Sequence, residues 1–184
     1  MNTKAILDAN TSIAIDAARC GRTVFNKASA DSKILLSHCG KEWKIGLDYL
    51  LEDVILKEIR SKSSYPILSE ESEDHENISG HYWIVDPLDG SANCLREIPI
   101  CAISIALWQN DRPILGVILD LTRDELYYGS DQCGAWCNDS PISVSGETRK
   151  DRAILNTGFP SALNINAGYL TKLAPFYGAF SKVR

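Results

Sequence analysis

The chain has 184 residues, 45% of them hydrophobic, and its 24 acidic and 19 basic residues give a net charge of −5. This composition suits a globular domain with a substantial core and excludes a disordered or fibrous chain. Because the charge is negative and no cluster of Lys and Arg stands out, we expect no nucleic-acid partner and no membrane partner, and a small ligand is the better interpretation.

The N-terminal residues and the cysteines indicate a cytoplasmic protein. Residues 1–6 lack an apolar core followed by a cleavage site, and no segment has the length needed to cross a bilayer. Six cysteines are scattered through a chain too large to depend on disulfides, so we interpret them as reduced and mostly buried thiols. Cys133 and Cys137 are closely spaced, but no second Cys or His pair lies near them, so zinc is not favoured.

Two helices are expected at the start of the chain. Apolar residues recur every three or four positions over Ile6–Val24, which predicts an amphipathic helix that covers one face of a sheet. A second apolar face over Leu47–Ile59 predicts another helix, after a loop at residues 40–46. Asp48 lies in the first turn of that helix, where the macrodipole favours an acid, so its position alone does not distinguish a catalytic role from a stabilising one.

The remaining chain has the pattern of a sheet followed by a helix. Short runs rich in β-branched and aromatic residues predict strands at residues 67–68, 83–85, 100–108, 114–121, 125–128, 142–144 and 153–155. Turn-forming residues at 110–113 and 121–124 indicate hairpins, so the sheet should be mostly antiparallel. Residues 166–182 predict a helix with a break or kink near Pro175. The expected fold class is α+β, with helices layered on a large sheet in one domain over residues 1–184.

The segment Trp83–Asn93 carries the residues most suited to chemistry. Asp86 follows an apolar run, and Gly90 allows the chain to turn sharply. In such a turn Asp86, the carbonyl of Leu88 and Asp89 can converge, and these oxygens form the ligand set that Mg²⁺ prefers. Asp-Pro and Asp-Gly are also ordinary turn dipeptides, so the segment alone does not separate a metal site from a turn.

A second acidic position supports the metal interpretation. Glu70 and Glu71 follow the preceding predicted strand, and neighbouring strands would bring them within reach of Asp86. Adjacent glutamates otherwise belong mostly to the solvated surface. The backbone amides of Gly90, Ser91 and Ala92 would point out of the turn and could bind an anion such as phosphate.

Together these residues resemble the inositol monophosphatase family, which belongs to a superfamily of lithium-sensitive, magnesium-dependent phosphomonoesterases. The resemblance covers nearly the whole chain and rests on Glu70–Ser72, on Trp83–Ser91 with Asn93 and Pro99, and on residues 116–117 and 133–138. It implies the first part of an αβαβα sugar-phosphatase fold, a homodimer, and hydrolysis of a small phosphate monoester. The substrate would be an inositol phosphate or a related sugar or nucleotide phosphate.

The resemblance also implies a role for individual residues. Glu70, Asp86 and the Leu88 carbonyl would hold one Mg²⁺, and Asp86 with Asp89 would help to hold a second. The amides of the segment from Gly90 to Ala92 would bind the phosphate.

The catalytic residues implied by the family are Glu70, Asp48 and Ser91. Asp48 would pair with the hydroxyl of Ser91 beside a metal-activated water, which attacks phosphorus directly, and Glu70 would assist the deprotonation of that water. Ile45 stands where threonine is common in the family, so the hydrogen bonding around Asp48 is not fixed by the pattern.

Other functions stay open at this point. The sequence stops at Arg184, where the family continues into a second sheet that carries another metal-binding aspartate. One alternative is therefore a fragment that binds metal and phosphate without turnover, and another is a member like the phosphoadenosine phosphate phosphatases or the fructose bisphosphatases. In a third, structural interpretation the acidic segment is only a turn.

Overall fold

The computed structural model describes residues 3–39, 42–69, 79–159 and 165–184. The chain forms two compact units, which are Met1–Cys39 with Trp43–Ile142, and Gly40–Glu42 with Ser143–Arg184. The expectation of a single domain stays a prediction.

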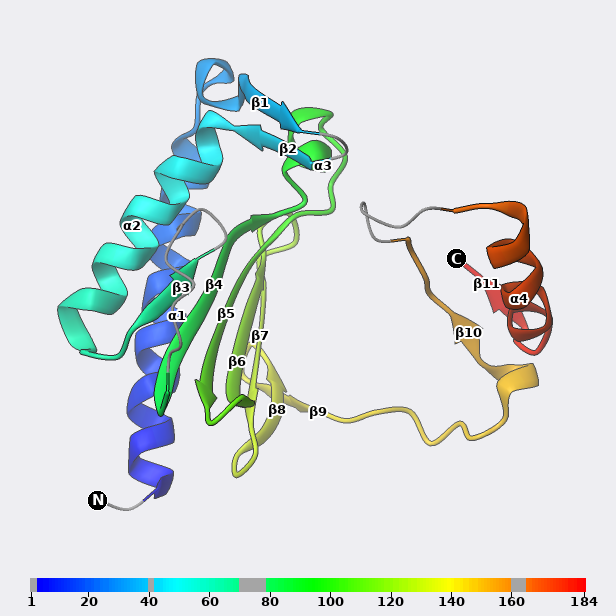
Figure 1. Ribbon diagram of the computed structural model, residues 1–184. Helices are drawn as coiled ribbons and strands as arrows, with labels where there is room; N and C mark the ends of the chain where they lie inside the picture. The colour runs from blue at the N-terminus through cyan, green and yellow to red at the C-terminus, as the bar shows by residue number, and fades with distance from the viewer. Residues whose placement is uncertain (1–2, 40–41, 70–78, 160–164) are drawn as a thin grey trace. The chain divides into compact units, whose positions relative to one another are not determined.

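Two helices cover one face of the large sheet in the first unit (Figure 1). The predicted amphipathic helix is α1 (Thr3–Lys27), and the second predicted helix is α2 (Gly46–Lys62). Three small residues of α1 are fully buried, namely Ala14, Ala17 and Ala18. Because alanine has a short side chain, α1 can pack closely against both α2 and the strands.

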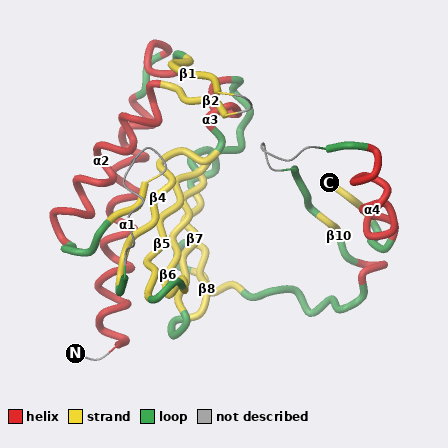
Figure 2. Tube along the Cα trace, viewed as in Figure 1, coloured by secondary structure: helices red, strands yellow, loops and turns green. Residues whose placement is uncertain are grey.

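The large sheet has seven strands in the order β3-β4-β5-β6-β7-β8-β9 (Figure 2). They are β3 (Ile67–Ser69), β4 (His81–Asp89), β5 (Ala102–Gln109), β6 (Arg112–Asp120), β7 (Glu125–Ser130), β8 (Gly134–Cys137) and β9 (Ser140–Ile142). Only β3 and β4 pair in parallel, so the predicted mostly antiparallel sheet is confirmed. The predicted hairpin turns are present, with positive φ at Asn110, Asp111 and Asp124.

The sequence prediction was wrong about the segment before α2. Residues 40–46 were expected to form a loop, but the chain forms a two-stranded sheet of β1 (Leu35–Cys39) and β2 (Glu42–Ile45). Each strand is too short to show a clear alternation of apolar and polar residues, which explains the error. The 3₁₀ helix η1 (Ala30–Lys33) connects α1 to β1. A third α-helix, α3 (Ser91–Leu95), follows β4 directly.

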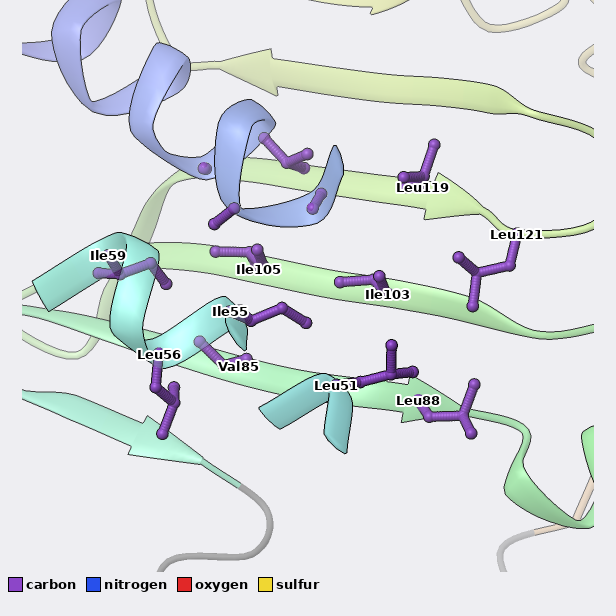
Figure 3. Packing of buried hydrophobic residues seen from close by; sticks show 14 of the residues in the cluster. Leu51, Ile55, Leu56, Ile59, Val85, Leu88, Ile103, Ile105, Leu119 and Leu121 are labelled. Atoms are coloured by element: carbon purple, nitrogen blue, oxygen red, sulfur yellow. The ribbon is translucent and has the colours of Figure 1, made fainter. Parts of the chain in front are cut away.

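The core of the first unit lies between the two long helices and the sheet. Side chains from α2 face side chains from β4 and β5 (Figure 3), and α1 packs against β5 and β6. The largest fully buried residue is Trp83, and its Nε1 donates a hydrogen bond of 3.0 Å to Ser63 Oγ at the end of α2. This bond satisfies the polar atom of a buried aromatic ring and ties the helix to the sheet.

The second unit contains η2 (Lys150–Arg152), β10 (Ile154–Leu155), α4 (Ala167–Gly178) and β11 (Lys182–Val183), and its two strands pair in parallel. The predicted helix over residues 166–182 is therefore shorter than expected at its C-terminal end. It ends one turn beyond Pro175, in agreement with a break near the proline. Within the described parts of the chain, no helix combines the length and hydrophobicity that a membrane crossing requires.

Candidate active site

The acidic segment lies at an irregularity in β4. Asp86 pairs with Ser104 and Asp89 pairs with Ala102, so three steps along β4 correspond to two steps along β5. The extra residue is a β-bulge, which bends the strand and changes the direction of its side chains. We expected the strand to end at Asp86, but the pairing continues to Asp89 and the bulge supplies the curvature.

Gly90 makes the turn that follows the bulge, and its conformation requires glycine. Its φ is +94°, and a Cβ at this position would lie 2.7 Å from the backbone oxygen of Ile100. An L-residue would meet both the left-handed backbone penalty and a steric clash. The predicted role of Gly90 as a sharp turn is therefore confirmed, and the turn leads directly into α3.

Asp48 and Ser91 meet, although 43 residues separate them in the sequence. Ser91 Oγ donates a hydrogen bond of 2.6 Å to Asp48 Oδ1. Asp48 is buried, with an exposed fraction of only 4%. The other oxygen, Oδ2, accepts a bond of 2.7 Å from the backbone N–H of Ile45. Ile45 has no side-chain donor or acceptor, but its N–H provides the contact, so the hydrogen bonding left open by the sequence has a defined arrangement.

The Ser91 hydroxyl also contacts the backbone of the bulge. The carbonyl oxygen of Leu88 lies 3.0 Å from Ser91 Oγ, which is longer than the distance to Asp48. A hydroxyl has one proton, and a bond to a carboxylate is stronger than one to a carbonyl, so the proton belongs mainly to the Asp48 bond. The lone pairs of Oγ then remain able to accept a proton from another molecule.

The described carboxylates of the bulge are Asp86 and Asp89. Asp86 Oδ1 accepts a bond of 3.1 Å from the Leu88 N–H, which holds that carboxylate against the bulge, and Asp89 is exposed. Glu70 and Glu71 lie outside the described residues. Their preceding residue, Ser69, pairs with Val85, the residue before Asp86.

The donors in the bulge suit a hard cation, since carboxylate and carbonyl oxygens are the ligands of Mg²⁺. Among the residues that the structure describes, no group of three or more His, Cys, Asp or Glu side chains is placed to hold a metal. The family resemblance predicts Glu70 as a further ligand, and that prediction falls outside the described residues.

The predicted phosphate-binding amides are at the start of α3. Ser91 and Ala92 are the first residues of this helix, and Gly90 is its N-cap. The first N–H groups of a helix have no acceptor within the helix. After α3 the loop is held by Asn93, whose Nδ2 donates a bond of 2.9 Å to the carbonyl of Ile100.

One contact near the site was not predicted. The guanidinium of Arg96 lies 5.2 Å from the centre of the Trp43 ring, which is a cation–π contact between β2 and the residue that caps α3. Trp43 was expected in a loop, and four residues of β2 are too few to signal a strand. A cavity of about 670 Å³ lies elsewhere, along α1 and β6–β7, and its lining includes Arg19, Arg22 and Asp124 but none of the predicted site residues.

The fold is that of solved inositol monophosphatase structures, and comparison with known proteins identifies the family. A model of the inositol monophosphatase family matches residues 8–174. The chain belongs to the inositol monophosphatase family, as the resemblance predicted.

Individual relatives support the same assignment. An inositol-1-monophosphatase of Rhizobium meliloti (strain 1021) is 35% identical over 140 residues, which cover 74% of this chain and 53% of that protein. The crystal structure of extragenic suppressor protein suhB from Bartonella henselae has a TM-score of 0.79 and 29% identity, covering 94% of this chain and 68% of that one. An IMPase/NADP phosphatase complexed with Mg²⁺ and phosphate shares the fold, with a TM-score of 0.78 at 18% identity, over 97% of this chain and 67% of that one. The chain spans about half the length of the curated relative.

Proposed function

We propose that this chain carries the site of a magnesium-dependent phosphomonoesterase that hydrolyses an inositol phosphate or a related sugar or nucleotide phosphate. The observation that carries the proposal is the 2.6 Å hydrogen bond from Ser91 Oγ to buried Asp48, next to the oxygen-rich bulge of β4. Such a buried pair is a way to prepare a hydroxyl for proton transfer. Family membership, and the Mg²⁺ and phosphate in the related IMPase/NADP phosphatase, support the same function.

The proposed metal ligands are oxygen atoms. Glu70, Asp86 and the carbonyl of Leu88 would hold one Mg²⁺, and Asp86 with Asp89 would help to hold a second. When bound, Mg²⁺ would neutralise charge on the phosphate and the leaving alkoxide and would lower the pKa of a water molecule. The side chain of Leu88 is 2% exposed, so packing in the core fixes the residue whose carbonyl is the proposed ligand.

The protein groups then have separate tasks in the reaction. Because Ser91 Oγ donates to Asp48, it can accept a hydrogen bond from an attacking water, and a proton from that water would move to Oγ as the serine proton moves to the Asp48 carboxylate. The carboxylate of Asp48 stabilises the hydroxyl in this orientation, and Glu70 would assist the deprotonation. The amides of residues 90–92 would hold the phosphate oxygens, so that attack on phosphorus proceeds from a fixed geometry and needs no phosphoenzyme.

A second candidate function is binding of metal and phosphate without turnover. The sequence left this alternative open, and the chain spans about half the length of its curated relative. Under this alternative Mg²⁺ and phosphate would still stabilise the fold, but no monoester would be hydrolysed.

The experiment compares the wild-type chain with Asp86→Asn. Release of inorganic phosphate from an inositol monophosphate is measured with and without Mg²⁺, and thermal unfolding is followed with Mg²⁺ plus phosphate. The enzyme proposal expects Mg²⁺-dependent release that Asp86→Asn abolishes. The matched control is Asp53→Asn, an exposed carboxylate on α2, which should keep wild-type activity.

Each other result supports a different function. Stabilisation by Mg²⁺ plus phosphate without release from any monoester would support the binding alternative. No stabilisation at all would support the structural interpretation, in which the segment is only a turn. Full release by Asp86→Asn would mean that the assigned metal site is wrong.

We also keep as proposals the homodimer, the cytoplasmic location, and the absence of nucleic-acid and membrane partners. The assembly is measured by analytical ultracentrifugation over a range of concentrations. A sedimenting species of twice the chain mass would support the homodimer, and a single species of the chain mass would contradict it.

A further inference from the structure

The short helix α3 is held at both ends by one part of the chain, where β2 leads directly into α2 (Figure 1). At the first residue of α3, Ser91 Oγ donates a hydrogen bond of 2.6 Å to Asp48 Oδ1. At its C-cap, the guanidinium of Arg96 lies 5.2 Å from the centre of the Trp43 ring. Asp48 is in the first turn of α2 and Trp43 is in β2, so two contacts join α3 to the segment 43–48, which we call the β2–α2 junction.

The β2–α2 junction links its two contact residues to one another. Ile45 lies between them in the sequence, and its backbone N–H donates a bond of 2.7 Å to Asp48 Oδ2. Ile45 is fully buried, so this part of the junction is fixed by the core. Trp43 and Ile45 are two residues apart on one strand, and their side chains therefore lie on the same face of β2. A displacement of Trp43 would thus act on the residue that orients Asp48.

The C-terminal end of α3 transmits the position of Arg96 to the whole helix. The backbone N–H of Ile98 donates a bond of 2.9 Å to the carbonyl of Asn93. The N–H of Glu97 donates a bond of 3.2 Å to the carbonyl of Cys94, and Glu97 has a left-handed φ of +57°. These two bonds and the left-handed residue make a Schellman motif, which closes the last turn of a helix. Arg96 is the C-cap inside this motif, so its backbone is fixed to α3.

The length of α3 makes these contacts necessary for its orientation. The helix has five residues, far fewer than a helix needs to be stable by itself. Its direction therefore depends on what holds its ends. The contact at Arg96 lies at the opposite end from Ser91, and two fixed ends define the orientation of the helix where one would leave it free to pivot.

We propose that Arg96 and Trp43 are positioning residues, whose contact fixes α3 against the β2–α2 junction and keeps Ser91 Oγ aligned with Asp48. This inference rests on the proposed function, in which that aligned pair takes the proton of the attacking water. Arg96 and Trp43 do not touch the reacting atoms in this account. They act through the orientation of α3.

The size of the effect follows from the kind of contact. Arg96 is exposed, and a cation–π contact at an exposed position changes an equilibrium by a factor of about two to five. Loss of the contact should reduce the population of the aligned helix by up to that factor. We therefore expect kcat/KM for phosphate release to fall about two- to fivefold.

The first experiment measures kcat/KM for phosphate release from an inositol monophosphate with Mg²⁺, together with urea unfolding. Arg96→Gln removes the charge, Arg96→Lys retains it, and Trp43→Leu removes the ring. Arg96→Gln and Trp43→Leu should each lower kcat/KM, and the double variant should be no slower than either, because both remove one contact. Arg96→Lys should recover most of the wild-type value. The matched control is Arg60→Gln, an exposed arginine on α2, which should leave kcat/KM unchanged.

The second experiment does not depend on activity. Two-dimensional ¹H–¹⁵N NMR follows the backbone amides of Ser91 and Ala92 at the far end of α3. Arg96→Gln should shift both resonances, and Arg60→Gln should leave them in place. In a chain that already carries Trp43→Leu, the same Arg96→Gln change should produce no further shift, whereas a direct effect of the lost charge would persist.

The outcomes separate this inference from the proposed function. Wild-type kcat/KM in Arg96→Gln, or single effects that multiply in the double variant, would overturn the positioning role. A loss of stability in urea with unchanged kcat/KM would show that the contact only stabilises the fold, and would also overturn it. Absence of phosphate release by the wild-type chain would contradict the proposed function. In that case the amide shifts still decide whether the contact orients α3, and unshifted resonances in Arg96→Gln would overturn the inference.

Discussion

Replacing Asp48 by asparagine tests the proton arrangement of the site with little change in shape. In the wild-type chain Oδ1 accepts from Ser91 Oγ and Oδ2 accepts from the N–H of Ile45. The amide oxygen of the substituted residue can accept only one of these bonds. If it keeps the bond from Ile45, its NH₂ group faces Ser91 and must donate to Oγ. The hydroxyl proton then turns to the carbonyl of Leu88, which lies 3.0 Å away.

Asp48→Asn should have a small effect on stability and a large effect on the reaction rate. Two charge-assisted hydrogen bonds become neutral ones, at about 1 kcal/mol each, so the free energy of unfolding should fall by about 2 kcal/mol. Loss of a positioned base typically lowers the rate by about 10²–10⁴-fold. We therefore expect Asp48→Asn to fold, with a modest loss of stability, and to lose nearly all phosphate release.

The assay combines urea unfolding with phosphate release, for Asp48→Asn, Ser91→Ala and the double variant. Because the two residues act as one unit, the double variant should be hardly slower than either single variant. The exposed control Asp53→Asn should match the wild type in both measurements. The reasoning is refuted if Asp48→Asn keeps wild-type activity, or if the two single effects multiply in the double variant.

Further substitutions test the turn, the carboxylate of a hairpin and the core. Gly90→Ala should lower the free energy of unfolding in urea by about 2 kcal/mol or more, because position 90 has a positive φ and a backbone oxygen lies 2.7 Å from the new Cβ. The control Gly146→Ala, whose new Cβ would lie in open space, should change that free energy by less than about 0.5 kcal/mol. Burial raises the pKa of Asp120, but hydrogen bonds within the following turn outweigh it and hold that pKa at about 2, below its ordinary value of 3.8. Because the folded-state pKa is lowered, the ionised carboxylate stabilises the fold above pH 3.8, and this stabilisation is lost as the pH falls through about 2. Asp120→Asn should make the free energy of unfolding less dependent on pH over that range. An unchanged slope of that free energy against pH would contradict the assignment. Trp83→Phe removes the bond to Ser63 and leaves a cavity, so thermal unfolding should show a loss of about 2 kcal/mol, and an unchanged midpoint would count against that contact.

The sequence predicted the parts of the fold that have long and regular patterns. The apolar positions of α1 and α2 follow the helical period over several turns, and the hairpins around β6 have clear turn residues. The strands β1, β2 and β8 have four or five residues each, too few for a period to emerge. The helix α4 continues through Pro175 and ends at Gly178, and the apolar pattern did not locate that end.

The candidate site was predictable only in part. The sequence placed Asp86, Asp89 and Gly90 in one turn, since neighbours in the chain stay neighbours in space. The contact between Asp48 and Ser91 depends on how α2 packs against β4, and it came from the family resemblance instead of from local patterns.

The most direct test of the central claim is calorimetric titration of the chain with inorganic phosphate, with and without Mg²⁺. The proposed site predicts that phosphate binds only when Mg²⁺ is present, and that Asp86→Asn removes this binding while Asp53→Asn retains it. Equal phosphate binding with and without Mg²⁺, or unchanged binding by Asp86→Asn, would contradict it.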